Sequence, residues 1–209
     1  MTQKEIALNA VQALKNEYPD AICSLVASDP LQLLIATRLS AQCTDARVNL
    51  VTPALFEKYP SAEDFADADV SDVEKLIHSC GFFRQKAKDI VGLSQMILSD
   101  FDEKVPDNIE DLTKLPGVGR KTANLIVGDV YGKPAVVADT HLIRISNRLG
   151  LVDTKDPYKV EIKLKKLLPP EESNDFCHRA VLHGRAVCDS RKPKCENCVM
   201  NSFCKKKIK

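Results

Sequence analysis

A glycine-containing turn with helical patterns on both sides constrains the fold of this chain more than any other feature. Residues 115–123 read Leu-Pro-Gly-Val-Gly-Arg-Lys-Thr-Ala. Pro116 ends the preceding segment, and Gly117 and Gly119 permit backbone angles that a Cβ atom forbids. From Arg120 onward, apolar residues recur at helical spacing. The pattern predicts a helix, a tight turn and a second helix.

The start of that second helix predicts an anion-binding site. Backbone N–H groups at a helix N-terminus point outward with the positive end of the helix dipole behind them, and phosphate is their usual ligand. A P-loop needs glycine directly before the lysine, where this chain has Arg120 before Lys121. A dinucleotide fingerprint needs a preceding strand, which residues 111–115 do not resemble. A glycine-containing corner that binds no ligand stays as the alternative.

Almost every other segment also has apolar residues at helical spacing. Predicted helices include residues 3–18, 86–101, 140–149 and 172–187, with glycines at 81, 132 and 150 as stops. Predicted helix starts are Asp29-Pro30, Thr44-Asp45, Asp156-Pro157, Ser61-x-x-Asp64 and Ser71-x-x-Glu74. The one strand-like run, residues 136–138, is too short for a sheet. The sequence predicts an all-α fold of about nine to eleven helices.

Charge is distributed unevenly along the chain. The net charge of the 209 residues is +1, but residues 158–209 hold 13 Lys/Arg against 6 Asp/Glu. A basic end on a near-neutral chain suggests a face that meets a polyanion, although a solvated charge run also explains it. The N-terminus does not resemble a signal peptide, and no apolar run is long enough to span a bilayer. We expect a cytoplasmic monomer with no membrane partner.

Four of the eight cysteines form a cluster near the C-terminus. Cys188, Cys195, Cys198 and Cys204 follow the pattern C-x6-C-x2-C-x5-C. Four thiolates so close in sequence can bind one centre, and this spacing favours a [4Fe–4S] cluster over zinc and over disulfides. The scattered cysteines at 23, 43, 80 and 177 fit buried small hydrophobic residues better.

Four stretches in this order resemble the endonuclease III family of DNA base-excision glycosylases. They are residues 39–45 (Leu-Ser-Ala-Gln-Cys-Thr-Asp), residues 115–123, residues 137–141 (Val-Ala-Asp-Thr-His) and the cysteine pattern ending at Cys204. The resemblance covers nearly the whole chain. It implies a bifunctional enzyme that flips an oxidised pyrimidine out of duplex DNA, removes the base and cleaves the abasic site by β-elimination. In a prokaryote, such an enzyme works in the cytoplasm at the nucleoid.

The resemblance assigns Lys121 as the nucleophile and Asp139 as the catalytic carboxylate. A lysine amine attacks C1′ of the sugar only when it is neutral. Partial burial, the helix dipole and Arg120 all favour the neutral form. Asp139 stabilises positive charge on the sugar and then moves protons. A phosphate-contacting lysine and a helix N-cap are the structural alternatives, and capping is compatible with catalysis.

Further residues are expected to contact DNA. By family position, Gln42 and Phe82 fill the hole that the flipped base leaves, although the family commonly has leucine where Phe82 stands. Asp45 borders the damage pocket or caps a helix. The other expected contacts come from the glycine turn and from the basic loop that follows the first cluster cysteine: Gly117, Gly119, Arg120, Arg191, Lys192 and Lys194.

The resemblance also implies the architecture. Residues 23–135 would form a six-helix barrel with a helix-hairpin-helix motif, and residues 1–22 and 136–209 a discontinuous iron–sulfur domain. Duplex DNA with a damaged base or an abasic site would lie in the cleft between these two lobes. Two alternatives remain: an adenine-mismatch glycosylase, whose pattern lacks the lysine at 121, and a non-catalytic iron–sulfur DNA-binding module, which the two catalytic residue types disfavour.

Overall fold

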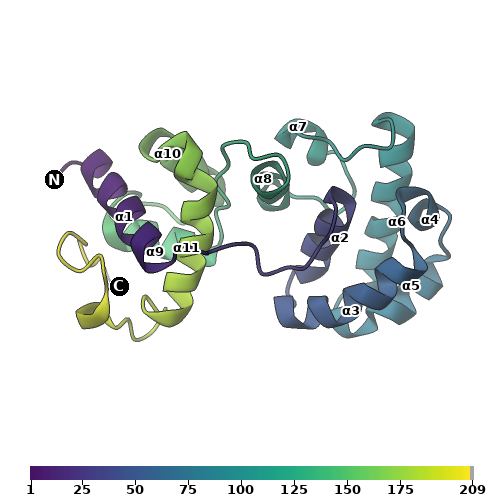
Figure 1. Ribbon diagram of the computed structural model, residues 1–209, viewed down its shortest axis with the longest axis horizontal. Coiled ribbons are helices and arrows are strands. Elements are labelled where there is room, and N and C mark those ends of the chain that lie inside the picture. The colour runs from purple at the N-terminus through teal and green to yellow at the C-terminus, as the bar shows by residue number, and fades with distance from the viewer. Residues whose placement is uncertain (208–209) are drawn as a thin grey trace. The chain divides into compact units, whose positions relative to one another are not determined.

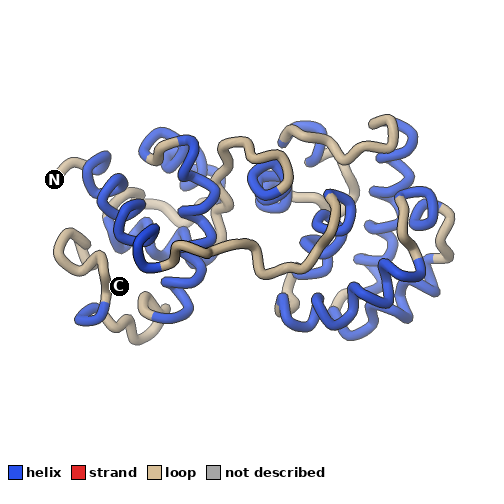
Figure 2. The backbone as a smooth tube through the Cα atoms, in the orientation of Figure 1, coloured by secondary structure: helices blue, strands red, loops and turns tan. Residues whose placement is uncertain are grey.

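The computed structural model describes residues 1–207, and these residues form helices joined by loops, with no strand (Figures 1 and 2). This confirms the predicted all-α fold. The α-helices are α1 (Gln3–Glu17), α2 (Pro30–Ser40), α3 (Asp45–Lys58), α4 (Ala62–Ala66), α5 (Val70–Ile77), α6 (Phe83–Asp100), α7 (Ile109–Leu112), α8 (Arg120–Asp129), α9 (Thr140–Leu149), α10 (Pro157–Leu167) and α11 (Ser173–Ala186). Short 3-10 helices are η1 (His78–Cys80), η2 (Pro170–Glu172) and η3 (Cys195–Asn197). No helix in the described part of the chain has the length and apolarity needed to cross a membrane.

The chain divides into two compact units. Residues 24–131 form one, here called the hairpin unit, and residues 1–23 with 132–209 form the other, here called the cysteine unit. The hairpin unit contains α2 to α8, whereas the cysteine unit contains α1 and α9 to α11.

Helix α6 organises the core of the hairpin unit. It packs against α2, α4 and α5, while α2 also packs against α3 and α8. The buried face of α6 carries Ile90, Leu93 and Ile97 at the predicted helical spacing. Burying side chains of this size contributes about 1.5–3 kcal/mol each. Helix α8, which follows the glycine turn, is held in place by its packing against α2.

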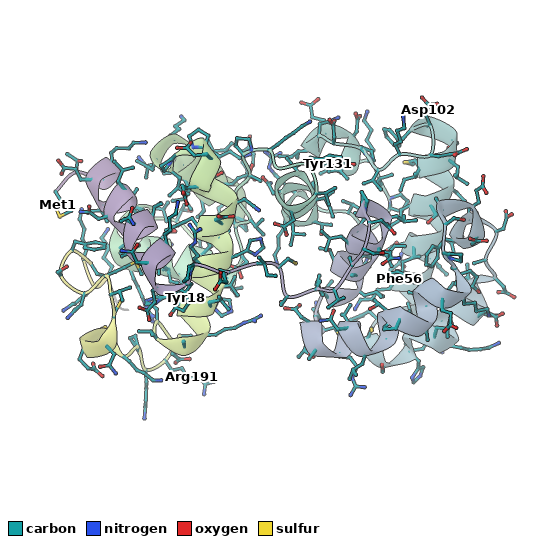
Figure 3. All side chains as sticks on the ribbon, in the orientation of Figure 1. Met1, Tyr18, Phe56, Asp102, Tyr131 and Arg191 are labelled. Atoms are coloured by element: carbon teal, nitrogen blue, oxygen red, sulfur yellow. The ribbon has the colours of Figure 1, made fainter. Side chains whose placement is uncertain are left out.

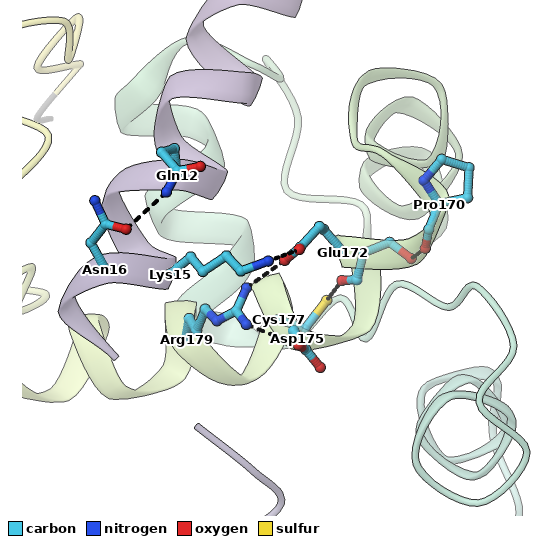
Figure 4. Close-up of polar contacts among 9 residues, drawn as sticks. Gln12, Lys15, Asn16, Pro170, Glu172, Asp175, Cys177 and Arg179 are labelled. Atoms are coloured by element: carbon cyan, nitrogen blue, oxygen red, sulfur yellow. Dashed lines mark hydrogen bonds and ion pairs between the residues drawn. The ribbon is translucent and has the colours of Figure 1, made fainter. Parts of the chain in front are cut away.

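Helix α11 plays the corresponding part in the cysteine unit, where it packs against α1 and α9. Ion pairs reinforce the α1–α11 contact (Figure 4). Glu172 accepts from Lys15 of α1 and, at 2.7 Å, from Arg179 Nη1. Arg179 Nη2 also reaches Asp175 Oδ2 at 2.9 Å. Because Arg179 is nearly fully buried, its two carboxylate partners compensate much of the cost of removing its charge from water.

Most of the predicted helix starts are confirmed. Asp29, Thr44, Ser61 and Asp156 each cap a helix with a side-chain oxygen. The box proposed at Ser71 is wrong, because Asp69 is the N-cap of α5 and accepts from the Ser71 N–H at 2.8 Å. Asp69 lies two residues before Ser71 and provides the capping oxygen in its place, so α5 begins at Val70.

Two further boundaries differ from the prediction. Helix α6 begins at Phe83, because the left-handed backbone of Phe82 sets its start, rather than at residue 86. Helix α8 ends at Asp129 with Val130 as its C-cap, so Gly132 lies in the following turn, where its φ is +61°. Gly150 does end α9 as predicted, with φ +80°.

Candidate functional site

The glycine turn has the predicted helix-turn-helix form, with α7 before it and α8 after it. Leu115 and Val118 are buried and anchor the turn, while Gly117 has φ +72°. Gly119 is the N-cap of α8 and provides no side-chain cap. The N-terminus of α8 therefore lacks the side-chain oxygen that caps most helices of this chain, which is the arrangement that accommodates a phosphate oxygen.

Gly117 is also required because its backbone lies against a buried ion pair. Arg38 of α2 donates from Nε to Asp89 Oδ2 of α6 at 2.7 Å, and its Nη2 lies 2.5 Å from the same oxygen. A Cβ atom on Gly117 would lie 2.5 Å from Asp89 Oδ2. This pair was not predicted, because no local pattern connects two residues that lie 51 positions apart.

The structure places Lys121 as the second residue of α8, with an exposed side chain. The partial burial predicted for Lys121 is therefore wrong for the protein without DNA. The amine lies in the first turn of α8, and the neighbouring Arg120 is also exposed. The side chain is open to a ligand.

Asp139 is the N-cap of α9, as the structural alternative predicted. Its Oδ1 accepts from the Leu142 N–H at 2.7 Å, and the side chain is half-buried. The cap holds the carboxylate in one orientation at the start of α9.

Gln42 and Phe82 share an unusual backbone conformation. Both have positive φ, 55° for Gln42 and 46° for Phe82. Both side chains are exposed, and Phe82 is 68% exposed despite its size. A left-handed conformation costs a residue with a Cβ atom about 1–2 kcal/mol and is concentrated at functional sites. Asp45, in the first turn of α3, accepts from Ser24 Oγ at 2.5 Å.

The four cluster cysteines line one pocket in the cysteine unit. All are half-buried free thiols, and the rest of the wall combines apolar side chains such as Ile145, Leu149 and Met200 with polar ones such as Arg148 and Lys194. Among residues 1–207, no three His, Cys, Asp or Glu side chains converge on one point. Four cysteine thiols around one pocket are the donor set that a [4Fe–4S] cluster takes, so the residues present fit the cluster.

Two arginines of α9 attach the first part of the cysteine loop to the helix. Arg148 Nη1 donates to Cys188 Sγ at 3.2 Å and to the Asp189 carbonyl at 2.6 Å, and its Nη2 donates to the Ser190 carbonyl at 2.9 Å. Arg144 Nε donates to the Cys188 carbonyl at 3.0 Å. Neither arginine was predicted from the sequence. The sequence pattern that could have indicated them is a pair of arginines one helical turn apart on a helix that precedes the cysteines.

His183 supports another of the thiols. Its Nε2 lies 3.3 Å from Cys198 Sγ, and its Nδ1 lies 3.2 Å from the hydroxyl of Tyr18, a residue labelled in Figure 3. Burial lowers the pKa of His183 to about 4, so the ring is neutral near pH 7. A neutral ring accepts from Tyr18 at Nδ1 and donates from Nε2 to the sulfur. Burial also raises the pKa of the Cys198 thiol. Coordination to iron would favour the thiolate and so counteract this effect of burial.

The basic loop is exposed at each of its three cations, Arg191 (labelled in Figure 3), Lys192 and Lys194. Asp189 shapes the loop because its Oδ1 accepts from the N–H groups of Arg191 at 2.8 Å and Lys192 at 3.0 Å. The Lys194 N–H donates to the Val187 carbonyl at 3.0 Å, which brings the end of the loop back to its start. Arg191 and Lys192 therefore project from a fixed turn, whereas Lys194 Nζ donates back to the Ala186 carbonyl at 3.1 Å.

Comparison with known proteins agrees with these observations. Residues 35–170 match the model of the HhH-GPD superfamily of base excision DNA repair proteins, and residues 188–204 match the iron–sulfur binding domain of endonuclease III. The chain is 48% identical to endonuclease III of Synechocystis over 97% of this chain and 93% of that protein. The chain belongs to the endonuclease III family. It is therefore a DNA glycosylase with lyase activity at abasic sites.

Other endonuclease III proteins agree over similar lengths. That of Bacillus subtilis is 44% identical, covering 90% of this chain and 86% of that protein. A solved structure of a trapped endonuclease III–DNA covalent intermediate superposes with a TM-score of 0.91 at 40% identity, covering 99% of this chain and 97% of that chain. The second matched segment begins at Cys188 and ends at Cys204. The cofactor of the cysteine unit is the predicted [4Fe–4S] cluster.

Proposed function

We propose that this protein removes oxidised pyrimidines from duplex DNA and cleaves the resulting abasic site through a Schiff base on Lys121. The observation that carries the proposal is the position of this lysine. Its exposed amine lies in the first turn of α8, directly after a glycine turn that leads into a helix N-terminus without a side-chain cap. A phosphate held there brings the attached sugar near the amine.

The chemistry requires a neutral amine and a leaving base. Lys121 Nζ attacks C1′, the C1′–N bond to the base breaks, and the departing base takes up a proton. Ring opening then gives an iminium ion between Nζ and C1′. Loss of a proton from C2′ breaks the C3′–O bond, so the 3′ phosphate leaves and the strand is cut.

Asp139 is the proposed carboxylate partner of this reaction. Its carboxylate stabilises positive charge on the sugar as the base departs, and it then accepts and returns protons. The N-cap contact to Leu142 orients the carboxylate for this purpose. Capping and catalysis therefore use the same side chain.

Contacts to duplex DNA are assigned to three surfaces. Gln42 and Phe82 enter the stack in place of the flipped base, with Asp45 beside the base pocket. Gly117, Gly119 and Arg120 bind phosphate at the hairpin, and Arg191, Lys192 and Lys194 bind phosphate from the basic loop. Cys188, Cys195, Cys198 and Cys204 would hold the cluster, which would fix the loop that carries these cations. The expected partner is duplex DNA with a damaged base or an abasic site, bound by a monomer at the nucleoid of a prokaryotic cell.

The test is reductive trapping on a panel of lesions. The purified protein is incubated with duplexes that carry thymine glycol, undamaged thymine, or adenine opposite 8-oxoguanine, in the presence of borohydride. We expect a covalent protein–DNA product on thymine glycol, and none with Lys121→Gln. No product on thymine glycol, or an undiminished product with the variant, would contradict the proposal. A release of adenine alone would establish the mismatch enzyme instead.

A further inference from the structure

Lys86 is a buried lysine that the proposed chemistry leaves without a role. Its side chain is 0% exposed, although it lies on a helix with a solvent-facing side. An ammonium group removed from water is costly unless hydrogen bonds compensate it, and burial lowers the pKa of Lys86. The position is visible in the sequence as a lysine one turn before Ile90 on the apolar face of α6.

The Lys86 ammonium joins the ends of two separate helices. Nζ donates to the Leu39 carbonyl at 2.7 Å and to the Cys80 carbonyl at 2.6 Å. Leu39 is the penultimate residue of α2, and Cys80 is the last residue of η1. Both carbonyls lie where a helix runs out of its own N–H donors, so the lysine satisfies groups that would otherwise be unpaired.

These two helix ends lead directly into the turns that carry Gln42 and Phe82. Gln42 follows Leu39 by three residues, and Phe82 follows Cys80 by two. The main chain of Lys86 contributes as well, because its N–H donates to the Phe82 carbonyl at 3.1 Å. One residue thus contacts the base of both turns, whose left-handed backbones need support from their surroundings.

We propose that Lys86 is a positioning residue for base extrusion, which holds the Gln42 and Phe82 turns at a fixed spacing so that both side chains enter the duplex together. The inference rests on the proposed function, because it takes those two side chains as the residues that replace the flipped base. Lysine suits the role because its ammonium has three donors, which is enough for two carbonyls from different segments.

The experiment separates positioning from chemistry by the choice of DNA. Lys86→Met keeps the length and apolar stem of the side chain but removes its donors. Single-turnover excision of thymine glycol from a duplex requires entry into the base stack. Borohydride trapping on a single-stranded oligonucleotide with a preformed abasic site does not. Lys88→Met on the same helix, at an exposed position, is the matched control.

We expect Lys86→Met to slow duplex excision about tenfold or more, while single-strand trapping stays within about twofold of the unchanged protein. The double variant Lys86→Met/Phe82→Ala should excise the base from duplex DNA only slightly more slowly than Phe82→Ala alone, because both changes disrupt entry into the base stack. If Lys86→Met does not fold, Lys86→Gln, a shorter side chain with two donors, replaces it under the same expectations.

An equal loss on both DNA substrates, no loss on either, or effects that multiply with Phe82→Ala would overturn the positioning role. Failure of the proposed function gives a different result: the unchanged protein itself would then not be trapped on the single-stranded abasic site.

Discussion

The glycine turn of the hairpin unit and the basic loop of the cysteine unit are both irregular segments assigned to DNA phosphates, yet they are held in different ways. The turn is fixed by polypeptide alone: Gly117 lies against the Arg38–Asp89 ion pair, and its conformation requires glycine. The loop is fixed by arginine contacts to its carbonyls and by four thiols that belong to a cluster. One of these two proposed phosphate-binding surfaces is therefore complete once the chain folds, whereas the other also depends on a cofactor.

Loss of the cluster should give the largest effect. It should disorder the basic loop of the cysteine unit and leave the glycine turn of the hairpin unit unchanged. Cys198→Ala should abolish the iron–sulfur absorbance and release the basic loop, so DNA binding should weaken strongly and retain only the contribution of the glycine turn. Hydrogen exchange in α6 and α8 should not change, because the hairpin unit has its own core. Cys23→Ala is the control, since Cys23 lies outside the cluster pattern and should leave the absorbance unchanged. Faster exchange in α8 of Cys198→Ala would show that the two surfaces are not independent.

Asp139→Asn should reduce turnover without changing stability. Asparagine caps helices as well as aspartate does, so the melting temperature should stay close to that of the unchanged protein. Because the charge is lost, single-turnover excision should fall by a factor on the order of 100 or more. Asp139→Ala should lose the same activity and also about 1 kcal/mol of stability. Full activity in Asp139→Asn would show that Asp139 caps α9 and has no catalytic role.

Gly117→Ala should damage the hairpin while leaving the cluster intact. The Cβ atom meets the Arg38–Asp89 pair, and φ +72° is unfavourable for alanine. Together these effects should cost about 2–4 kcal/mol of unfolding free energy. Gly119→Ala provides the matched comparison, because its Cβ would meet nothing within 4 Å, and it should cost less than about 1 kcal/mol. Denaturant unfolding measures both, with absorbance as the check on the cluster. Equal losses would mean that the ion pair does not constrain the turn.

Lys192→Ala should have the smallest effect, and it tests whether this lysine of the basic loop contacts a DNA phosphate. Loss of one phosphate contact should reduce the slope of log K against log salt by about 0.9, with a modest loss of affinity. Lys163→Ala, an exposed lysine of α10 in the same unit, should leave the slope unchanged. Binding to an undamaged duplex, measured by fluorescence anisotropy over a salt series, tests this. An unchanged slope in Lys192→Ala would remove this lysine from the interface.

The two surfaces also differ in how far they can be predicted from the sequence. The glycine turn and the cysteine spacing are local patterns, so the amino-acid sequence alone is enough to recognise both. Their supports are not local, because Arg38 and Asp89 meet across 51 residues, and Arg148 reaches carbonyls 41 and 42 positions away. Such contacts depend on how the helices pack. The periodicity of apolar residues predicts which face of a helix is buried, but it does not predict which helix packs against that face. The strained backbones of Gln42 and Phe82 are equally hard to predict, since neither residue type signals a positive φ.

The most direct test of the central claim is to find which atom bonds to the sugar. After borohydride reduction of the complex with a thymine glycol duplex, proteolysis and mass spectrometry should place the deoxyribose remnant on the peptide that contains Lys121, and fragmentation should assign it to that lysine. A remnant on any other lysine or on the N-terminal amine would contradict the account, as would base release with no covalent product.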